Sequence, residues 1–318
     1  MNFEELYGLA RSIEDEAAKA IVGQSPVVRD TVIALLAGGH VLLEGVPGTA
    51  KTLLARTLAR IFGGEFRRIQ FTPDLMPSDI TGGRVFNLKT SEFERRPGPV
   101  FCDLLLADEI NRTSAKTQSA LLEAMQERRV SLDGESYPLS PVFTVIATQN
   151  PVESEGTYPL PEAQRDRFLL QVLIGYPSFE DEDRMLERFA PLGAEASLER
   201  LGVNPVVTAE LLREARELVV SVAVQPDVRR YALTLVELSR RDPALLYGAS
   251  PRATLHLLQA AKAHAVLNRR DFVTPDDVKA MAAPALRHRL ILRAEAEIEG
   301  STPDEVILRL IQGAEIPR

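Results

Sequence analysis

The sequence of 318 residues predicts an α/β domain followed by an all-α domain. In the first half of the chain, short apolar runs with the length of buried strands alternate with amphipathic stretches of helical period. Beyond Pro177 these β-type runs disappear, and helical segments follow one another, several of them beginning with Ser-Pro or Thr-Pro. We therefore expect an α/β domain over residues 1–176 and a helical domain over residues 177–318.

Composition and charge narrow the class of protein. Apolar residues make up 45% of the chain, so both domains can bury a core. The formal charge is −8, and an acidic surface repels phosphate backbones, so we expect no nucleic-acid partner. The single cysteine, Cys102, lies in an apolar run and suits a reducing compartment. The first residues are acidic, and no apolar run reaches the roughly 18 residues of a membrane helix, so we expect a cytoplasmic protein without membrane insertion.

Before residue 52, the chain is predicted to form two helices and a buried strand. Residues 3–20 have amphipathic helical period, and a second helix from Ser25-Pro26 to Leu36 ends at a Gly-Gly pair. Residues 40–52, HVLLEGVPGTAKT, then predict a strand, a turn and the start of a helix at Lys51.

The spacing of this turn is that of a phosphate-binding loop, in which backbone N–H groups and the helix N-terminus face the phosphates of a nucleotide. Lys51 would reach the β- and γ-phosphates, and the Thr52 hydroxyl would bind Mg²⁺. Ala50 stands where a glycine is usual, which we expect to be tolerated if its φ is negative. The alternative is a plain Gly-Pro turn before a surface helix. The predicted nucleotide contacts are Gly45, Val46, Pro47, Gly48, Thr49, Ala50, Lys51, Thr52 and Leu53.

A helix over residues 53–64 and a strand over residues 65–71 are predicted next. The segment 72–100 is rich in Pro, Gly and Asp, and such long insertions are usually functional; a hairpin of residues 84–88 and 91–96 is expected within it. Asp133-Gly134 predicts a second hairpin, after a helix over residues 114–129.

Two further strands end in polar residues suited to nucleotide hydrolysis. The run 104–109, LLLADE, ends in Asp108, which can hold Mg²⁺ through a water, and in Glu109, which can polarise the attacking water. The run 142–151 ends near Asn150, which could orient that water. The alternatives are an ordinary strand that ends at a polar loop and, for Asn150, a turn former before Pro151.

Three arginines are candidates for the γ-phosphate. Arg165 and Arg167 lie on a short segment before the last predicted strand, and either could complete the site of a neighbouring molecule. Arg252, at the start of a helix in the second domain, could point across the interdomain cleft at the nucleotide. Arg165 and Arg167 could instead be ordinary surface arginines, and Arg252 a plain arginine at a helix N-terminus.

Together these motifs resemble the MoxR family of AAA+ ATPases. The resemblance rests on residues 45–52, 73–82, 105–112, 116–127, 147–151, 155–168 and 248–253, in that order. It implies a P-loop AAA+ domain, a five-stranded parallel sheet between helices, followed by an α-helical lid. It assigns Lys51 and Thr52 to Walker A and Asp108 and Glu109 to Walker B. Asn150 would be sensor 1, Arg167 the arginine finger and Arg252 sensor 2, and Val22 and Gly23 would lie near the adenine.

The resemblance also implies a function. Proteins of this family hydrolyse ATP with Mg²⁺ in rings, usually hexamers, and remodel or activate protein partners in a chaperone-like way, often proteins with von Willebrand factor A domains. The two insertions, at residues 72–100 and around Asp133-Gly134, resemble those with which the wider clade engages substrates or partners. Two alternatives remain open: an assembly scaffold switched by nucleotide, and a chelatase-type ATPase subunit.

Overall fold

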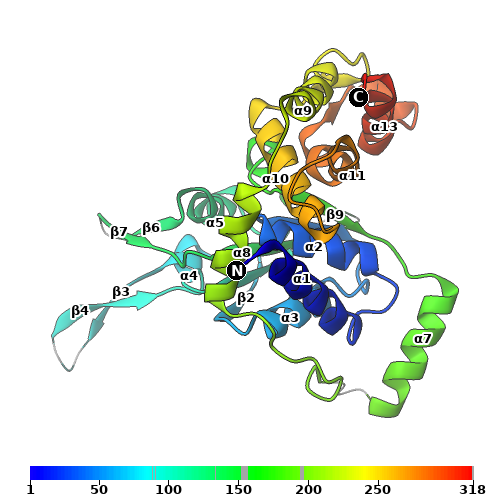
Figure 1. Ribbon diagram of the computed structural model, residues 1–318. Helices are drawn as coiled ribbons and strands as arrows, with labels where there is room; N and C mark the ends of the chain where they lie inside the picture. The colour runs from blue at the N-terminus through cyan, green and yellow to red at the C-terminus, as the bar shows by residue number, and fades with distance from the viewer. Residues whose placement is uncertain (88, 90, 133, 152–156, 194–196, 317–318) are drawn as a thin grey trace.

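A parallel sheet in the order β2-β5-β8-β1-β9 lies at the centre of the α/β part (Figure 1). This computed structural model describes residues 1–87, 89, 91–132, 134–151, 157–193 and 197–316. All neighbouring strands of the sheet are parallel. The strands are β1 Val41–Gly45, β2 Phe66–Gln70, β5 Leu104–Asp108, β8 Thr144–Gln149 and β9 Leu170–Ile174. The five-stranded parallel sheet implied by the family resemblance is therefore confirmed.

Helices cover both faces of this sheet. Side chains alternate between the faces along each strand. Leu43 and Leu106 therefore pack with α1, α2 and α3, whereas Leu42 and Leu105 pack on the other face with α5. A sheet buried on both sides has continuous apolar strands, which is why the sequence revealed them. The helices of this part are α1 Phe3–Ala18, α2 Ser25–Leu36, α3 Lys51–Phe62, α4 Pro77–Thr81, α5 Ala115–Glu127 and α6 Glu162–Arg165.

Two antiparallel hairpins project from the α/β part on the same side (Figure 1). One is β3 Gly82–Asn87 with β4 Glu92–Pro97, and the other is β6 Arg129–Leu132 with β7 Glu135–Pro138. The Arg95 guanidinium of the first hairpin lies 3.9 Å from the ring centre of Tyr137 in the second and 4.3 Å from that of Phe101. A cation between two aromatic faces is attractive, so this contact joins the two predicted hairpins. The acidic tip residue Asp133 lies outside the described residues.

The chain beyond Pro177 is helical, as predicted. Its helices are α7 Phe179–Phe189, α8 Ala209–Ser221, α9 Pro226–Ser239, α10 Pro251–Leu267, α11 Pro275–Leu286, α12 Ala294–Ile298 and α13 Pro303–Gly313. The structure adds a short antiparallel pair, β10 Leu245–Tyr247 with β11 Ile291–Leu292, whose strands are too short for a periodic signal. Among the described residues, no helix combines the length and the apolar character needed to cross a membrane.

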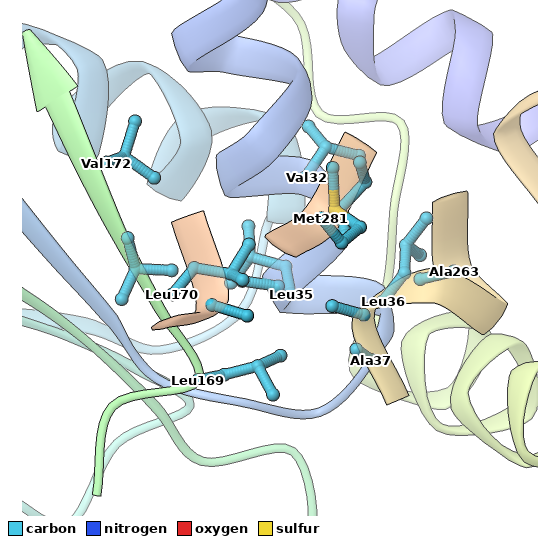
Figure 2. Close-up of a cluster of buried hydrophobic side chains, with 14 of the residues drawn as sticks. Val32, Leu35, Leu36, Ala37, Leu169, Leu170, Val172, Ala263 and Met281 are labelled. Carbon is cyan, nitrogen blue, oxygen red and sulfur yellow. The ribbon is translucent and has the colours of Figure 1, made fainter. Parts of the chain in front are cut away.

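The helical part packs directly on the α/β part. Figure 2 shows Leu35 and Leu36 of α2 beside Leu170 of β9, with Ala263 of α10 and Met281 of α11 against them. One continuous apolar cluster therefore runs from the sheet into the helices. The exact division of the chain at residues 176 and 177 stays a prediction.

His40, just before β1, is a neutral core residue. Its Nδ1 accepts a hydrogen bond from the Val145 N–H at 3.0 Å, and its Nε2 lies 3.3 Å from the Met125 carbonyl oxygen. Nε2 must therefore carry the proton. Burial, with a smaller contribution from Arg128, lowers the pKa of His40 to about 3.

Acidification should therefore destabilise the fold through His40. An unfolded histidine has a pKa of about 6.5, so between pH 7 and pH 5 only the unfolded chain takes up this proton, which costs roughly 2 kcal/mol. Denaturant unfolding of the wild type and of His40→Asn at both pH values measures it, and the variant should lose less stability. Burial raises the pKa of Asp30 to about 6, so its protonation between pH 7 and pH 5 stabilises the fold. This contribution is the same in the wild type and in His40→Asn. Equal losses would contradict the prediction.

Candidate functional site

A groove at the carboxyl ends of β1, β5 and β8 gathers most of the predicted site residues. Because parallel strands end at the same edge of the sheet, the phosphate-binding loop, the two acidic residues and Asn150 meet there. The groove is lined by Pro47, Gly48, Thr49, Ala50, Lys51, Thr52, Leu53, Arg68, Gln70, Asp108, Glu109 and Asn150. The structure thus brings together residues that lie more than a hundred positions apart in the sequence.

The loop between β1 and α3 is closed by its own residues. Gly45 is required at its start, because a Cβ atom there would lie 2.4 Å from the Ile174 carbonyl oxygen. The Lys51 ammonium donates to the carbonyl oxygens of Gly45 at 2.5 Å and Val46 at 2.8 Å. The Thr49 hydroxyl also donates to Val46, at 2.8 Å. These bonds hold Lys51 over the turn, at the N-terminus of α3, where anions are favoured.

Ala50 departs from the expectation that its φ is negative. It has φ 63° and ψ 21°, in the left-handed region, directly before α3. This conformation costs a residue with a Cβ about 1–2 kcal/mol, whereas glycine adopts it freely. The expectation of a negative φ at Ala50 was therefore wrong, and the loop carries backbone strain instead.

The variant Ala50→Gly should consequently be no less stable than the wild type. Relief of the left-handed strain outweighs the added freedom of an unfolded glycine, and we expect a gain of up to about 1 kcal/mol. Chemical denaturation without nucleotide measures this difference. As a control, Ala55→Gly, in the interior of α3, should lose stability. A similar loss at position 50 would show that Ala50 has negative φ in solution.

Asp108 is the most constrained acid of the groove. It is only 5% exposed, and its carboxylate accepts hydrogen bonds from the Thr148 hydroxyl at 2.6 Å and the Thr52 hydroxyl at 3.1 Å. The Arg68 guanidinium of β2 donates to the same carboxylate at 2.6 Å. A buried carboxylate needs such partners, since an unpaired charge in the interior is costly.

Glu109 follows with a strained backbone. Its φ is 57°, left-handed again, and its N–H donates to the Thr148 hydroxyl at 2.8 Å. Its carboxylate accepts from the Gln70 amide at 2.9 Å and lies 3.2 Å from Arg112 Nε. Strain of this kind is often stored at functional sites, where the surroundings fix it.

Two residues of the groove, Arg68 and Gln70, and one buried partner of Asp108, Thr148, were not assigned a role from the sequence. Arg68 and Gln70 are two positions apart on β2, so they share a face, and this spacing was the available signal. Thr148 stands in the polar strand end that already singled out Asn150.

Arg167 and Arg252 lie elsewhere, in a cavity at the opposite end of β1. The lining residues of this arginine cavity are Gly38, Gly39, His40, Met125, Gln126, Arg128, Arg167, Leu169, Arg252, His256 and Gln259. The phosphate-binding loop leaves the other end of the strand, five residues on, so the two sites are roughly 15 Å apart. Within one chain Arg252 therefore does not reach across to the phosphate-binding loop, contrary to the geometry first expected.

The arginine cavity is a strongly cationic environment. Three arginines line it, and no carboxylate does among the described residues. Within the residues that the structure describes, neither Arg167 nor Arg252 forms an ion pair. Burial and the neighbouring arginines Arg289 and Arg252 lower the pKa of His256 to about 3, so it stays neutral. Cations gathered without a counter-charge suit an anion supplied from outside.

The remaining candidates lie apart from both sites. Arg165 does not line the arginine cavity and lies near Glu44 of β1. Burial raises the pKa of Glu44, and the positive charges of Arg165, Arg287 and Lys51 act in the opposite direction. Val22 and Gly23 do not line the groove. Instead, Gly23 faces Asp181 of α7, whose carboxyl carbon lies 2.5 Å from where a Cβ would stand. Their role near an adenine stays a prediction.

Comparisons with known proteins define the class. Residues 40–170 match the family model described as "ATPase family associated with various cellular activities (AAA)", and residues 237–310 match that of the AAA lid domain. A solved structure of a putative ATPase from Cytophaga hutchinsonii superposes with a TM-score of 0.91 at 41% identity, over 99% of this chain and 97% of that one. The protein is an AAA ATPase with a lid.

Relatives narrow the class to a family. The chain is 44% identical to Chaperone MoxR1 of Mycobacterium tuberculosis, over 99% of this chain and 84% of that protein. It is 33% identical to Protein MoxR of Methylorubrum extorquens, over 91% and 89%, and 44% identical to the uncharacterised protein YeaC of Bacillus subtilis, over 99% and 97%. The chain belongs to the MoxR family of AAA ATPases, as its motifs indicated.

Proposed function

We propose that this protein hydrolyses ATP in a ring, most simply a hexamer, and uses the energy to remodel or activate protein partners in a chaperone-like way. One observation carries the proposal: the groove with the phosphate-binding loop and the cavity with the candidate arginines lie at opposite ends of β1. A second copy of the chain would bring the two together. Membership of the AAA ATPase family supports the hydrolysis, and the name of Chaperone MoxR1 supports the kind of work.

The groove holds the groups that ATP hydrolysis requires. Lys51 and the N–H groups of the loop would bind the phosphates, and Glu109 would accept a proton from the attacking water while Asn150 orients it. The Thr52 hydroxyl and the Asp108 carboxylate, 3.1 Å apart, form an oxygen donor set that fits Mg²⁺, Asp108 through a water. The metal would neutralise charge on the β- and γ-phosphates.

The arginine cavity would complete the site of the neighbouring subunit. Arg167 would act as the trans arginine finger, and Arg252 would contact the same nucleotide beside it. Both side chains lack an ion pair in the described part of the chain, so a γ-phosphate from the adjacent groove would supply the missing anion. Arg165, which is not in this cavity, is the weaker candidate.

Mixing two inactive variants tests the shared site. Glu109→Gln damages the groove and Arg167→Ala the cavity, so each ring alone should lose ATP hydrolysis, about 10³- to 10⁵-fold for the arginine. In a mixed ring about one junction in four pairs an intact groove with an intact cavity. Steady-state phosphate release should therefore recover on mixing.

The control is subunit exchange, followed by energy transfer between labelled subunits. No recovery in rings that have exchanged would mean that Arg167 does not act in trans, and Arg165→Ala would then take its place in the same assay.

The two hairpins are the proposed partner surface. Val85, Phe86 and Phe93 on β3 and β4 are about half exposed, and the two phenylalanine rings pack at 5.2 Å. An apolar cluster at the end of a projecting hairpin is suited to a protein partner. We propose that this partner is a protein with a von Willebrand factor A domain. We also propose that the protein works in the cytoplasm and does not bind nucleic acid.

Partner capture should depend on this cluster. Glu109→Gln loaded with ATP should enrich a von Willebrand factor A protein from its own cell extract, identified by mass spectrometry. Adding Phe86→Ser and Phe93→Ser should reduce capture by about tenfold or more, as for hot-spot residues, without altering nucleotide binding. Leu308→Ser, on an equally exposed residue of α13, is the matched control and should have no effect. Unchanged capture by the hairpin variant would refute this surface.

A further inference from the structure

Asp166, next to the candidate finger Arg167, is the centre of a partly buried polar network. Its carboxylate accepts a hydrogen bond from Arg289 Nε at 2.7 Å and lies 3.3 Å from the Ser250 hydroxyl. Asp166 ends α6 in the α/β part, whereas Ser250 and Arg289 belong to the helical part. One carboxylate therefore ties two distant segments of the helical part to the residue beside Arg167.

Arg289 donates hydrogen bonds to the backbone on both sides of Arg167. Its side chain is 1% exposed, and its guanidinium donates to the carbonyl oxygens of Asp166 at 3.1 Å, Phe168 at 2.5 Å and Leu169 at 3.3 Å. Its remaining contacts are the Ala285 carbonyl and His256 Nδ1. A planar guanidinium offers its donors in a fixed arrangement, so these bonds define one position for the segment that carries Arg167.

The same network fixes the start of α10, which carries Arg252. Ser250 is the N-cap of that helix, and its hydroxyl accepts from the Ala253 N–H at 3.4 Å while it contacts Asp166. His256, one turn beyond Arg252, accepts from Arg289 and lines the arginine cavity. Both cavity arginines thus emerge from backbone that is anchored to the Asp166–Arg289 pair.

We propose that Asp166 and Arg289 are positioning residues, which hold Arg167 and Arg252 as one rigid unit for delivery to the neighbouring subunit's nucleotide. The proposal rests on the proposed function, in which Arg167 acts in trans. Breaking the pair leaves the groove of the same chain intact but misplaces the cations it presents. A displacement of about 1 Å can reduce catalysis by about a hundredfold, so a pair that touches no substrate can still control the rate.

The experiment places Asp166→Asn in the mixing assay. Alone, it should lower kcat about 10- to 100-fold in assembled rings, with an almost unchanged KM for ATP because its groove is intact. Mixed with Glu109→Gln it should recover activity, since it contributes an intact groove. Mixed with Arg167→Ala it should not recover, since both chains lack a working cavity. A variant that was merely unstable would rescue neither partner.

A neighbouring ion pair supplies the matched control. Arg287 pairs with Asp304 at 2.9 Å and donates a hydrogen bond to the Gln171 carbonyl of β9, whereas none of its hydrogen bonds goes to residues 166–169. Asp304→Asn should therefore retain nearly full activity. A loss equal to that of Asp166→Asn would mean that docking of the helical part in general is required, and would overturn the proposal.

The other outcomes are equally decisive. Near wild-type kcat for Asp166→Asn, or failure to rescue Glu109→Gln where Arg167→Ala does rescue it, would refute the positioning role. If Arg167→Ala itself rescues nothing, the proposed shared site fails instead. Should Asp166→Asn not assemble, Ser250→Ala removes one contact of the same carboxylate and must show the same pattern of rescue with a smaller loss of kcat.

Discussion

The buried carboxylate of Asp108 is the constraint around which the groove is organised. It lies at the end of β5, where it is 5% exposed, and a charge in that position is stable only with close partners. Its partners come from three neighbouring elements: Thr52 from α3, Arg68 from β2 and Thr148 from β8. Thr148 also accepts from the N–H of Glu109, so the same contacts set the strained turn at the catalytic candidate. One acid thus takes its partners from each of these elements and links them through their side chains.

The sequence revealed the sheet because its strands are buried on both faces and therefore appear as continuous apolar runs. Lys51, Thr52, Asp108, Glu109 and Asn150, which the sequence assigned to one nucleotide site, all line one groove, since the carboxyl ends of parallel strands converge. Local backbone conformation could not be found in this way. The left-handed φ of Ala50 and Glu109 depends on tertiary contacts, and nothing in the residue types announces it.

The location of Arg252 was beyond the sequence for a related reason. Its position relative to the groove depends on how the helical part docks, and that docking is made by dispersed apolar side chains such as Leu36, Ala263 and Met281 (Figure 2). Such contacts leave no motif. The case of Arg68 and Gln70 is different, because their spacing on one strand is visible in the sequence. What the sequence does not show is that their strand, β2, pairs with β5.

The position of the arginine cavity bears on the role of the helical part. A lid that covered its own nucleotide would direct its polar side chains toward the phosphate-binding loop. Here Arg252, His256 and Gln259 of α10 line the opposite end of β1, and Arg289 is buried behind them. Like charges gathered in this cavity repel one another, at an energetic cost that water screens where Arg252 is exposed. A ring would recover that cost at each junction, because the phosphates of the adjacent subunit are the counter-charge that the cavity lacks, so nucleotide binding and subunit contact would strengthen each other.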